Sequence, residues 1–257
     1  MSTEVLGIVL RATPVRESDL LVNLYTDALG RVSAVARGGR KSQRRFAGAL
    51  SLLVLARFQL GRRPRGELFG LDAAEVVREW TSLASDVVAH AHASYVAELV
   101  GGLLPAEQPE PEALSLVIAL WDSLAEAGPS QGALRSVELH LLELAGHLPA
   151  IDRCAACGDA DVAVFDPHRG GAICRRCAAT SRGPGVRPFD AGARAYLRAI
   201  LAACDPAAAR AVDAGATGAE RTAAREALVA MIVGLVGHPL RTLEYLAKLG
   251  AAARQRP

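Results

Sequence analysis

The chain has 257 residues, 51% of them hydrophobic, and a formal net charge of +2. This length fits one large domain or, as we expect here, two. Its 24 glycines and 13 prolines are too few for a disordered or collagen-like chain. The longest uncharged apolar runs, 47–56 and 227–237, are about half as long as a membrane span. The N-terminus lacks the basic region and apolar stretch of a secretory signal, so the expected location is the cytoplasm.

Positive charge is concentrated near the N-terminus. Residues 1–80 carry a net charge of +5, whereas residues 81–257 carry a net charge of −3. Between positions 31 and 65 there are ten basic residues and no acidic one. These residues are Arg31, Arg37, Arg40, Lys41, Arg44, Arg45, Arg57, Arg62, Arg63 and Arg65. Such an excess predicts binding of a polyanion such as DNA, although a solvated basic face would have the same composition.

The first 80 residues have the pattern of short β-strands. Short apolar runs and alternation of apolar and polar residues predict strands at 5–11, 20–25, 31–37, 52–60 and 67–77. Five short strands are typical of an OB-fold barrel, and small SH3-like barrels have the same signature. The basic residues fall on outward strand faces and in the connections 38–48 and 61–66. An OB-fold binds nucleic acid with such a face and such loops.

The aromatic residues of this region have two expected positions. Tyr25, Phe58 and Phe69 are assigned to the core of the barrel. Phe46 lies among the arginines of the connection 38–48, so it either stacks on a base or packs beneath the loop.

After Trp80 the spacing of apolar residues becomes helical. We expect helices at 86–104, 112–127, 133–147, 190–203, 220–236 and 240–254, with Ser130 as an N-cap. A turn-rich segment that contains cysteines interrupts them at about 149–188. The predicted fold class is therefore α+β: a five-stranded barrel over residues 1–80, then an α-helical domain over residues 81–257 with an inserted metal site.

Four of the five cysteines form two C-x2-C pairs. Sixteen residues separate the pair Cys154 and Cys157 from the pair Cys174 and Cys177, a spacing typical of zinc sites. Four thiolates complete a tetrahedron around one Zn²⁺ and leave no position for water, so we expect a structural site. The alternative is that the two pairs are unrelated. Cys204 is expected to be a small buried hydrophobe.

Motifs of common enzyme classes are missing. The segment 38–42 has Arg40 where a phosphate-binding loop needs a glycine directly before the lysine. The patterns G-x-S-x-G and H-E-x-x-H do not occur. We therefore expect that the protein is not an enzyme.

Several N-terminal segments form a distinctive series: Gly-Ile-Val-Leu at 7–10, Arg-Glu-Ser-Asp-Leu-Leu at 16–21, Leu-Tyr-Thr-Asp-Ala-Leu-Gly at 24–30, Val-Ala-Arg-Gly-Gly-Arg-Lys at 35–41, and Arg45-Phe46 followed by Leu50 and a long strand. Together they resemble the RecO family of bacterial DNA repair proteins. The order of a basic barrel, helices, a four-cysteine insertion and further helices is also similar over essentially the whole chain. One departure is Gln43-Arg44-Arg45 in place of a Lys-Ser-Arg-like triplet, which keeps the charge of the loop.

The resemblance implies an N-terminal OB-fold and a helical domain with a zinc-ribbon-like insertion. It also implies a non-enzymatic mediator of recombinational repair that is cytoplasmic and associated with the nucleoid. Proteins of this kind bind single- and double-stranded DNA, anneal complementary strands, and act with RecR and the single-strand binding protein to load RecA. The alternative from another class is a zinc-ribbon and OB-fold protein that binds RNA or acts in transcription.

The resemblance further suggests that the acidic C-terminal tail of single-strand binding protein is a partner. An acidic tail needs a local positive patch, and the helix that begins near Arg241 is the most basic apolar helix of the C-terminal region. Arg241 is therefore the candidate partner-binding residue. The alternative is that the leucines of this helix belong to the core and its basic residues only stabilise the helix end.

Overall fold

The computed structural model describes residues 2–62, 68–181, 183–203 and 205–254. Contacts between residues divide the chain into two compact units, Met1–Glu126 with Tyr245–Pro257, and Ala127–Glu244. The domain boundary at residue 80 stays a prediction, because the division by contacts places the first two long helices with the barrel. Cys204 lies outside the described residues. In the part of the chain that is described, no helix has both the length and the apolar character needed to cross a membrane.

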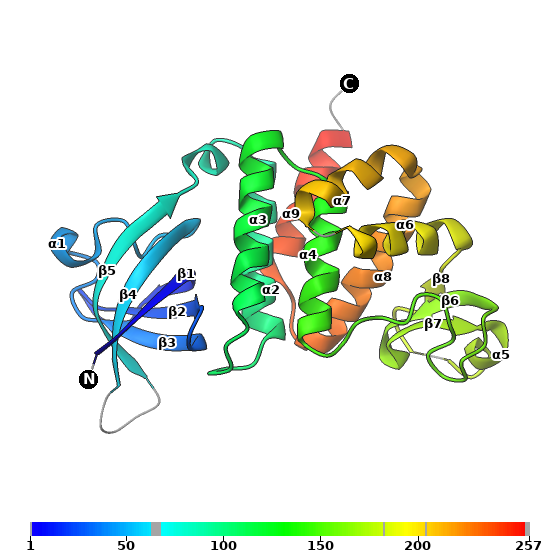
Figure 1. Cartoon of the computed structure of the whole chain (residues 1–257), viewed down its shortest axis with the longest axis horizontal. Helices are drawn as coiled ribbons and strands as arrows, with labels where there is room; N and C mark the ends of the chain where they lie inside the picture. The colour runs from blue at the N-terminus through cyan, green and yellow to red at the C-terminus, as the bar shows by residue number, and fades with distance from the viewer. Residues whose placement is uncertain (1, 63–67, 182, 204, 255–257) are drawn as a thin grey trace. The chain divides into compact units, whose positions relative to one another are not determined.

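The first unit contains a closed β-barrel (Figure 1). Its strands are β1 (Ser2–Pro14), β2 (Leu20–Thr26), β3 (Gly30–Ala36), β4 (Val54–Arg62) and β5 (Phe69–Glu79). They neighbour one another in the order β1-β2-β3-β5-β4, and β4 pairs with β1 to close the ring. The pair β3–β5 is parallel and the other pairs are antiparallel. This is the strand order of an OB-fold, so the predicted five-stranded barrel is confirmed.

Alternation along the strands fills the interior of the barrel. Val32, Ala34 and Ala36 of β3 are buried in its core, as their spacing predicts. Phe58 of β4 and Phe69 of β5 join the same core, which confirms their predicted positions.

Two further aromatic residues are buried in different ways. Phe46, in the short helix α1 (Gln43–Phe46), is 2% exposed and belongs to the barrel core, so it packs beneath the basic loop and offers no surface for base stacking. Tyr25 is also buried, but it is not part of the barrel core, and its hydroxyl donates to the carbonyl oxygen of Glu110 at 3.1 Å. The expectation for Tyr25 was wrong because the inward positions of β2 belong to Val22 and Leu24, and neighbouring residues face opposite sides.

Two long helices belong to the same unit as the barrel. The short helix η1 (Thr81–Ala84) leads into α2 (Val87–Leu103), which Asp86 caps by accepting hydrogen bonds from the N–H groups of Val88 and Ala89. The next helix is α3 (Pro111–Ala127). Its Trp121 meets Trp80, directly after β5, in an edge-to-face contact with ring centroids 5.0 Å apart. This pair anchors α3 to the end of the barrel.

The second unit is mainly helical. Its helices are α4 (Gln131–Leu144), α6 (Ala191–Ala202), α7 (Pro206–Val212), η3 (Asp213–Gly215) and α8 (Gly218–Val236), and α9 (Arg241–Arg254) begins in it. Ser130 caps α4 as predicted, accepting the N–H of Ala133 at 3.1 Å. Helix α7 was not expected, although Asp205 is its N-cap and Pro206 its first residue, which is a recognised start signal. A Cβ on Gly132 would lie 2.3 Å from the carbonyl oxygen of Ala209, so α4 and α7 are in backbone contact.

A small sheet interrupts these helices inside the predicted insertion 149–188. Its strands are β6 (Val162–Asp166), β7 (Gly171–Cys174) and β8 (Arg187–Pro188), in the order β7-β6-β8. The short helices η2 (Pro167–Arg169) and α5 (Arg175–Ala178) lie before and after β7. Phe165 and Phe189 are buried and pack edge-to-face with ring centroids 5.3 Å apart. The insertion therefore has a small apolar core of its own.

Candidate metal centre and nucleic-acid interface

The four predicted metal ligands come together in the insertion. The Sγ atoms of Cys154, Cys157, Cys174 and Cys177 all lie within 4.8 Å of one another. Those of Cys157 and Cys174 are 3.7 Å apart, close to the spacing of about 3.8 Å expected around a tetrahedral ion with bonds of about 2.3 Å to sulfur. All four cysteines are free of disulfides. They are therefore positioned to bind a metal ion, and the alternative of two unrelated pairs is wrong.

Each cysteine pair lies in a tight turn that directs two thiols toward the same point. In the first turn, the N–H of Gly158 donates to the carbonyl oxygen of Cys154 at 2.8 Å, and the N–H of Cys154 donates to that of Asp159 at 2.7 Å. In the second, Cys174 ends β7 and caps α5, its sulfur accepting the N–H of Cys177 at 3.5 Å. One pair of ligands is thus held by a loop and the other by the junction of a strand and a helix.

The thiols change one another's protonation. Burial acts to raise the pKa of Cys154, but hydrogen bonds from the backbone of Cys174, Ala156 and Cys157 and from the Cys157 thiol together outweigh it and lower that pKa to about 6. Interactions with the thiols of Cys157 and Cys174 raise the pKa of Cys177 to about 12. The cluster therefore does not carry four negative charges by itself, and a divalent cation would remove the repulsion that opposes the last deprotonation. Four clustered thiols fit a metal ion that prefers sulfur.

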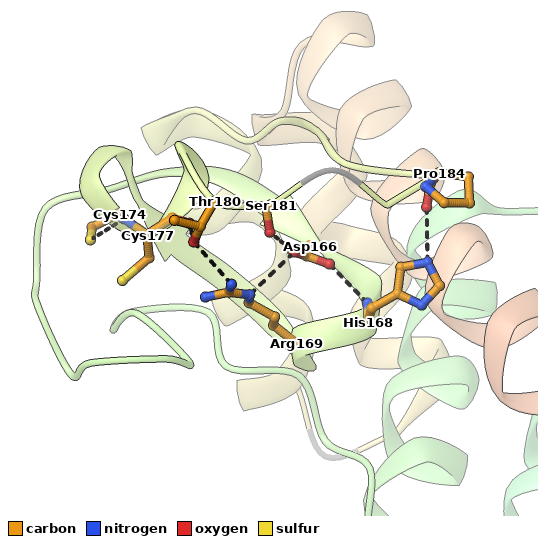
Figure 2. A network of polar contacts seen from close by, with 8 residues as sticks. All are labelled: Asp166, His168, Arg169, Cys174, Cys177, Thr180, Ser181 and Pro184. Atoms are coloured by element: carbon orange, nitrogen blue, oxygen red, sulfur yellow. Dashed lines mark hydrogen bonds and ion pairs between the residues drawn. The ribbon is translucent and has the colours of Figure 1, made fainter.

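A buried carboxylate supports the second cysteine turn (Figure 2). Asp166, the last residue of β6, is 2% exposed and accepts a hydrogen bond from the hydroxyl of Ser181. The Nε of Arg169 lies 3.7 Å from the same carboxylate, and its Nη2 donates to the hydroxyl oxygen of Thr180 at 3.1 Å. The hydroxyl of Thr180 in turn donates to the carbonyl oxygen of Cys177 at 2.9 Å. A continuous series of polar contacts therefore connects Asp166 to one of the ligands.

Five of the predicted DNA-binding residues lie in the connection between β3 and β4. They are Arg37, Arg40, Lys41, Arg44 and Arg45, and all five are exposed. The connection is anchored to the turn between β1 and β2, because the N–H of Gly38 donates to Asp19 Oδ1 at 2.9 Å. This hydrogen bond lowers the pKa of the Asp19 carboxyl, which keeps it charged. The five residues therefore project from a loop that is held in place at its start.

Four of these five cations form no ion pair in the described part of the chain. Arg40 donates to the carbonyl oxygen of Glu17 at 3.1 Å, and Arg45 donates to the hydroxyl of Ser42 at 3.3 Å while its guanidinium lies over the ring of Phe46. Arg37 and Arg44 also lack an ion pair within the described residues. The surface around Arg44 is therefore positively charged and open to an anion.

The fifth cation of the loop and several of the other predicted DNA-binding residues are placed differently. Lys41 of the loop pairs with Glu17 at 2.9 Å, and outside the loop the ion pairs are Arg57–Glu4 at 3.1 Å and Arg62–Glu107 at 2.6 Å. Arg31 is half-buried, and its guanidinium donates to the carbonyl oxygen of Gly101 in α2 at 3.0 Å. Arg63 and Arg65 lie outside the described residues. The ten residues therefore do not form one uniform surface, and the exposed arginines without an ion pair among the described residues lie in the loop between β3 and β4.

The predicted partner-binding residue, Arg241, lies at the start of α9 and is exposed. It follows Leu240, which is buried, and the same helix carries the exposed Lys248. The role of Arg241 in partner binding stays a prediction.

Comparison with known proteins decides the family. The model of "Recombination protein O N terminal" matches residues 1–80, and that of "Recombination protein O C terminal" matches residues 84–244. This chain belongs to the RecO family. The DNA repair protein RecO of Anaeromyxobacter sp. (strain K) is 40% identical to it over 251 residues, 95% of each chain. The RecO proteins of Myxococcus xanthus, 32% identical over 257 residues, and Symbiobacterium thermophilum, 33% identical over 256 residues, each cover at least 95% of both chains.

Membership of the RecO family assigns the chain to DNA repair and recombination. The resemblance stated from the N-terminal segments is thereby confirmed. The basic loop lies inside the match to the N-terminal RecO model, and the four cysteines lie inside the match to the C-terminal one.

The sequence pattern did not reveal the roles of two acidic residues, one beside the cysteine cluster and one beside a predicted DNA-binding arginine. Asp166 precedes Pro167, a pair that favours a turn, but nothing in the pattern shows that its carboxylate is buried. Glu107 follows the break after α2, and its pairing with Arg62 spans 45 positions of the chain. A contact of that separation leaves no local pattern.

Proposed function

We propose that the chain is a DNA-binding recombination mediator. In this proposal it binds single- and double-stranded DNA, promotes annealing of complementary strands, and assists RecA loading together with RecR and the single-strand binding protein. RecO family membership supports this role. The observation that carries it is the exposed loop on the OB-fold barrel in which Arg37, Arg40, Arg44 and Arg45 form no ion pair among the described residues.

The loop arginines act by neutralising phosphate charge. A guanidinium group offers a planar set of donors that matches two phosphate oxygens. Two strands whose phosphates are neutralised on one surface repel each other less, and base pairing between them then supplies the sequence selectivity. Because Phe46 is buried, the loop has no aromatic platform in its described part. We therefore expect binding that depends strongly on salt and weakly on base sequence.

Two matched double variants test the DNA-binding surface. Arg37→Ala with Arg44→Ala removes two loop cations, and Arg11→Ala with Arg225→Ala removes two exposed cations elsewhere, which also lack an ion pair in the described structure. Affinity for a fluorescent oligothymidylate is measured over a range of salt concentrations. If each loop arginine contacts one phosphate, the log–log slope of the first variant becomes shallower by about 1.4, from about 0.7 per contact on a single strand. The control is expected to keep the wild-type slope.

The same preparations test the remaining parts of the proposal. The wild-type chain is expected to anneal complementary oligonucleotides without added nucleotide, because the sequence has no phosphate-binding loop and four cysteine ligands leave a metal no open position. Equal slopes for both variants would show that the loop is not the DNA site. A preference for RNA without DNA annealing would favour the transcription-associated class, and DNA-stimulated ATP hydrolysis would contradict a protein that is not an enzyme.

We further propose that Cys154, Cys157, Cys174 and Cys177 hold one structural Zn²⁺. The mutual distances of their sulfur atoms support this proposal, as does the preference of zinc for four thiolates in structural sites. When bound, the ion would compensate the charge of the thiolates and connect the loop of Cys154 to the junction of β7 and α5.

Arg241 is our proposed contact for the acidic tail of single-strand binding protein, with the chain acting in the cytoplasm at the nucleoid. A fluorescent peptide with the sequence of that tail is titrated against the full chain. Arg241→Glu is expected to weaken binding about fivefold through charge reversal, whereas Arg225→Glu on α8 serves as the matched control. Equal affinities of the two variants would remove Arg241 from the partner surface and leave the DNA-binding proposal intact.

A further inference from the structure

The segment between α2 and α3 lies along the start of β3. Among the described residues, β5 pairs with β3 only at Ala34, Val35 and Ala36. There Arg31 forms a parallel bridge with Ala106. The N–H of Glu107 donates to the carbonyl oxygen of Arg31 at 3.0 Å. These contacts place Glu107 beside the start of β3, where its segment pairs with β3 as a short additional strand would.

At this position Glu107 meets one of the predicted DNA-binding residues. Its Oε2 lies 2.6 Å from Nη2 of Arg62, the last residue of β4. The side chains of Arg62 and Glu107 are 72% and 46% exposed, so the pair is accessible to ions from solvent. The guanidinium of Arg62 also lies over the ring of Phe69, 5.1 Å from its centroid, which keeps it at the barrel surface.

The backbone at Glu107 is set by its surroundings. Its φ angle is +54°, a left-handed conformation that residues other than glycine rarely adopt. The next residue, Gln108, approaches Gly30 so closely that a Cβ on that glycine would lie 2.1 Å from the Gln108 carbonyl oxygen. Neighbouring contacts therefore hold the segment in an unfavourable conformation, and in this conformation the carboxylate of Glu107 reaches Arg62.

We propose that Glu107 occupies the position of a DNA phosphate on Arg62 in the free protein and leaves it when DNA binds. Carboxylate and phosphate groups both present oxygen acceptors to the guanidinium fork. An exposed ion pair contributes little to stability, so a phosphate can replace the carboxylate at small cost. The inference rests on the proposed DNA-binding function. It adds that Arg62 contacts a phosphate and that Glu107 competes with this phosphate for Arg62.

A double-mutant cycle tests this competition. Affinity of the full chain for a fluorescent oligothymidylate is measured at low salt for the wild type, Glu107→Gln, Arg62→Ala and the double variant. Glu107→Gln is expected to tighten binding about threefold in the wild-type background and to have no effect when residue 62 is alanine. Glu112→Gln, at an exposed position of α3, removes the same charge away from Arg62 and is expected to change the affinity less.

A second variant separates the lost charge from backbone effects. Glu107→Gly removes the carboxylate and adopts a positive φ without strain, so it is also expected to tighten binding. The inference is overturned if Glu107→Gln leaves the affinity unchanged, acts equally in the Arg62→Ala background, or acts no more than Glu112→Gln. Absence of salt-dependent binding by the wild-type chain would instead overturn the proposed function, and this inference with it.

Discussion

At the scale of single residues, a buried carboxylate supports the turn that carries Cys174 and Cys177, two of the candidate metal ligands. Burying a charge is unfavourable unless its oxygens are paired. Asp166 meets this condition through the N–H of His168, the hydroxyl of Ser181 and the guanidinium of Arg169. Because these partners come from the turn after β6 and from the segment after α5, Asp166 joins the two stretches on either side of Cys174 and Cys177. We therefore expect Asp166 to act as a positioning residue for the second pair of candidate ligands.

Replacing this carboxylate should weaken the metal site without abolishing it. Asp166→Asn keeps the size of the side chain but turns an amide toward some of its donors, so we expect the affinity for zinc to fall about tenfold with one ion still bound. Competition with a chromophoric chelator measures the affinity, and the visible spectrum of the cobalt-loaded protein reports ligand geometry. Asp161→Asn changes the same charge at an exposed position of the insertion and is the control. Indistinguishable affinities of the two variants would contradict a positioning role.

At the scale of elements, the insertion is too small to be stabilised by apolar burial alone. Its sheet includes β8, a strand of only two residues, and its aromatic core is the pair Phe165 and Phe189. Segments of fewer than about 40 residues usually need a metal or disulfides for stability. The clustered cysteines are positioned to bind a metal, and binding of a metal to ligands that are apart in the unfolded chain would contribute directly to folding.

The stability of the second unit should therefore depend on the metal. Cys174→Ser removes a buried ligand at the end of β7, and we expect loss of bound zinc and a free energy of unfolding lower by about 2–5 kcal/mol. Elemental analysis of protein purified without chelator and denaturant unfolding measure the two effects. Chelation should lower the stability of the wild type to that of the variant and leave the variant unchanged. Wild-type protein that contains no metal would contradict the assignment.

At the scale of the whole molecule, folding redistributes the charge that composition describes. The stretch from 31 to 65 carries ten positive charges in sequence, but three of its described residues are paired with carboxylates. Those carboxylates belong to Glu4, Glu17 and Glu107, which lie outside the stretch. The effective positive surface in the described structure is therefore narrower than the sequence indicates and centres on the loop between β3 and β4.

Features that depend on neighbouring residues could be predicted from the sequence alone. Alternation placed Val32, Ala34 and Ala36 inside the barrel, because successive residues of a strand face opposite sides. The two C-x2-C pairs predicted the metal cluster, because each pair needs only one tight turn to bring its thiols together. The N-cap at Ser130 followed from the same kind of local rule.

What only the tertiary structure decided are the contacts between residues far apart in the chain. Glu4 and Arg57 are 53 positions apart, and Arg62 and Glu107 are 45 apart. The sequence shows how many cations a stretch contains. Which carboxylate pairs with a given cation depends on strand pairing and on the packing of loops. Tyr25 shows the same limit: it is buried as expected, but outside the barrel core, and its hydroxyl donates to the carbonyl oxygen of Glu110 just before α3. Whether a residue is buried follows from the local spacing of apolar residues, whereas the distant residues that contact it are determined by the fold.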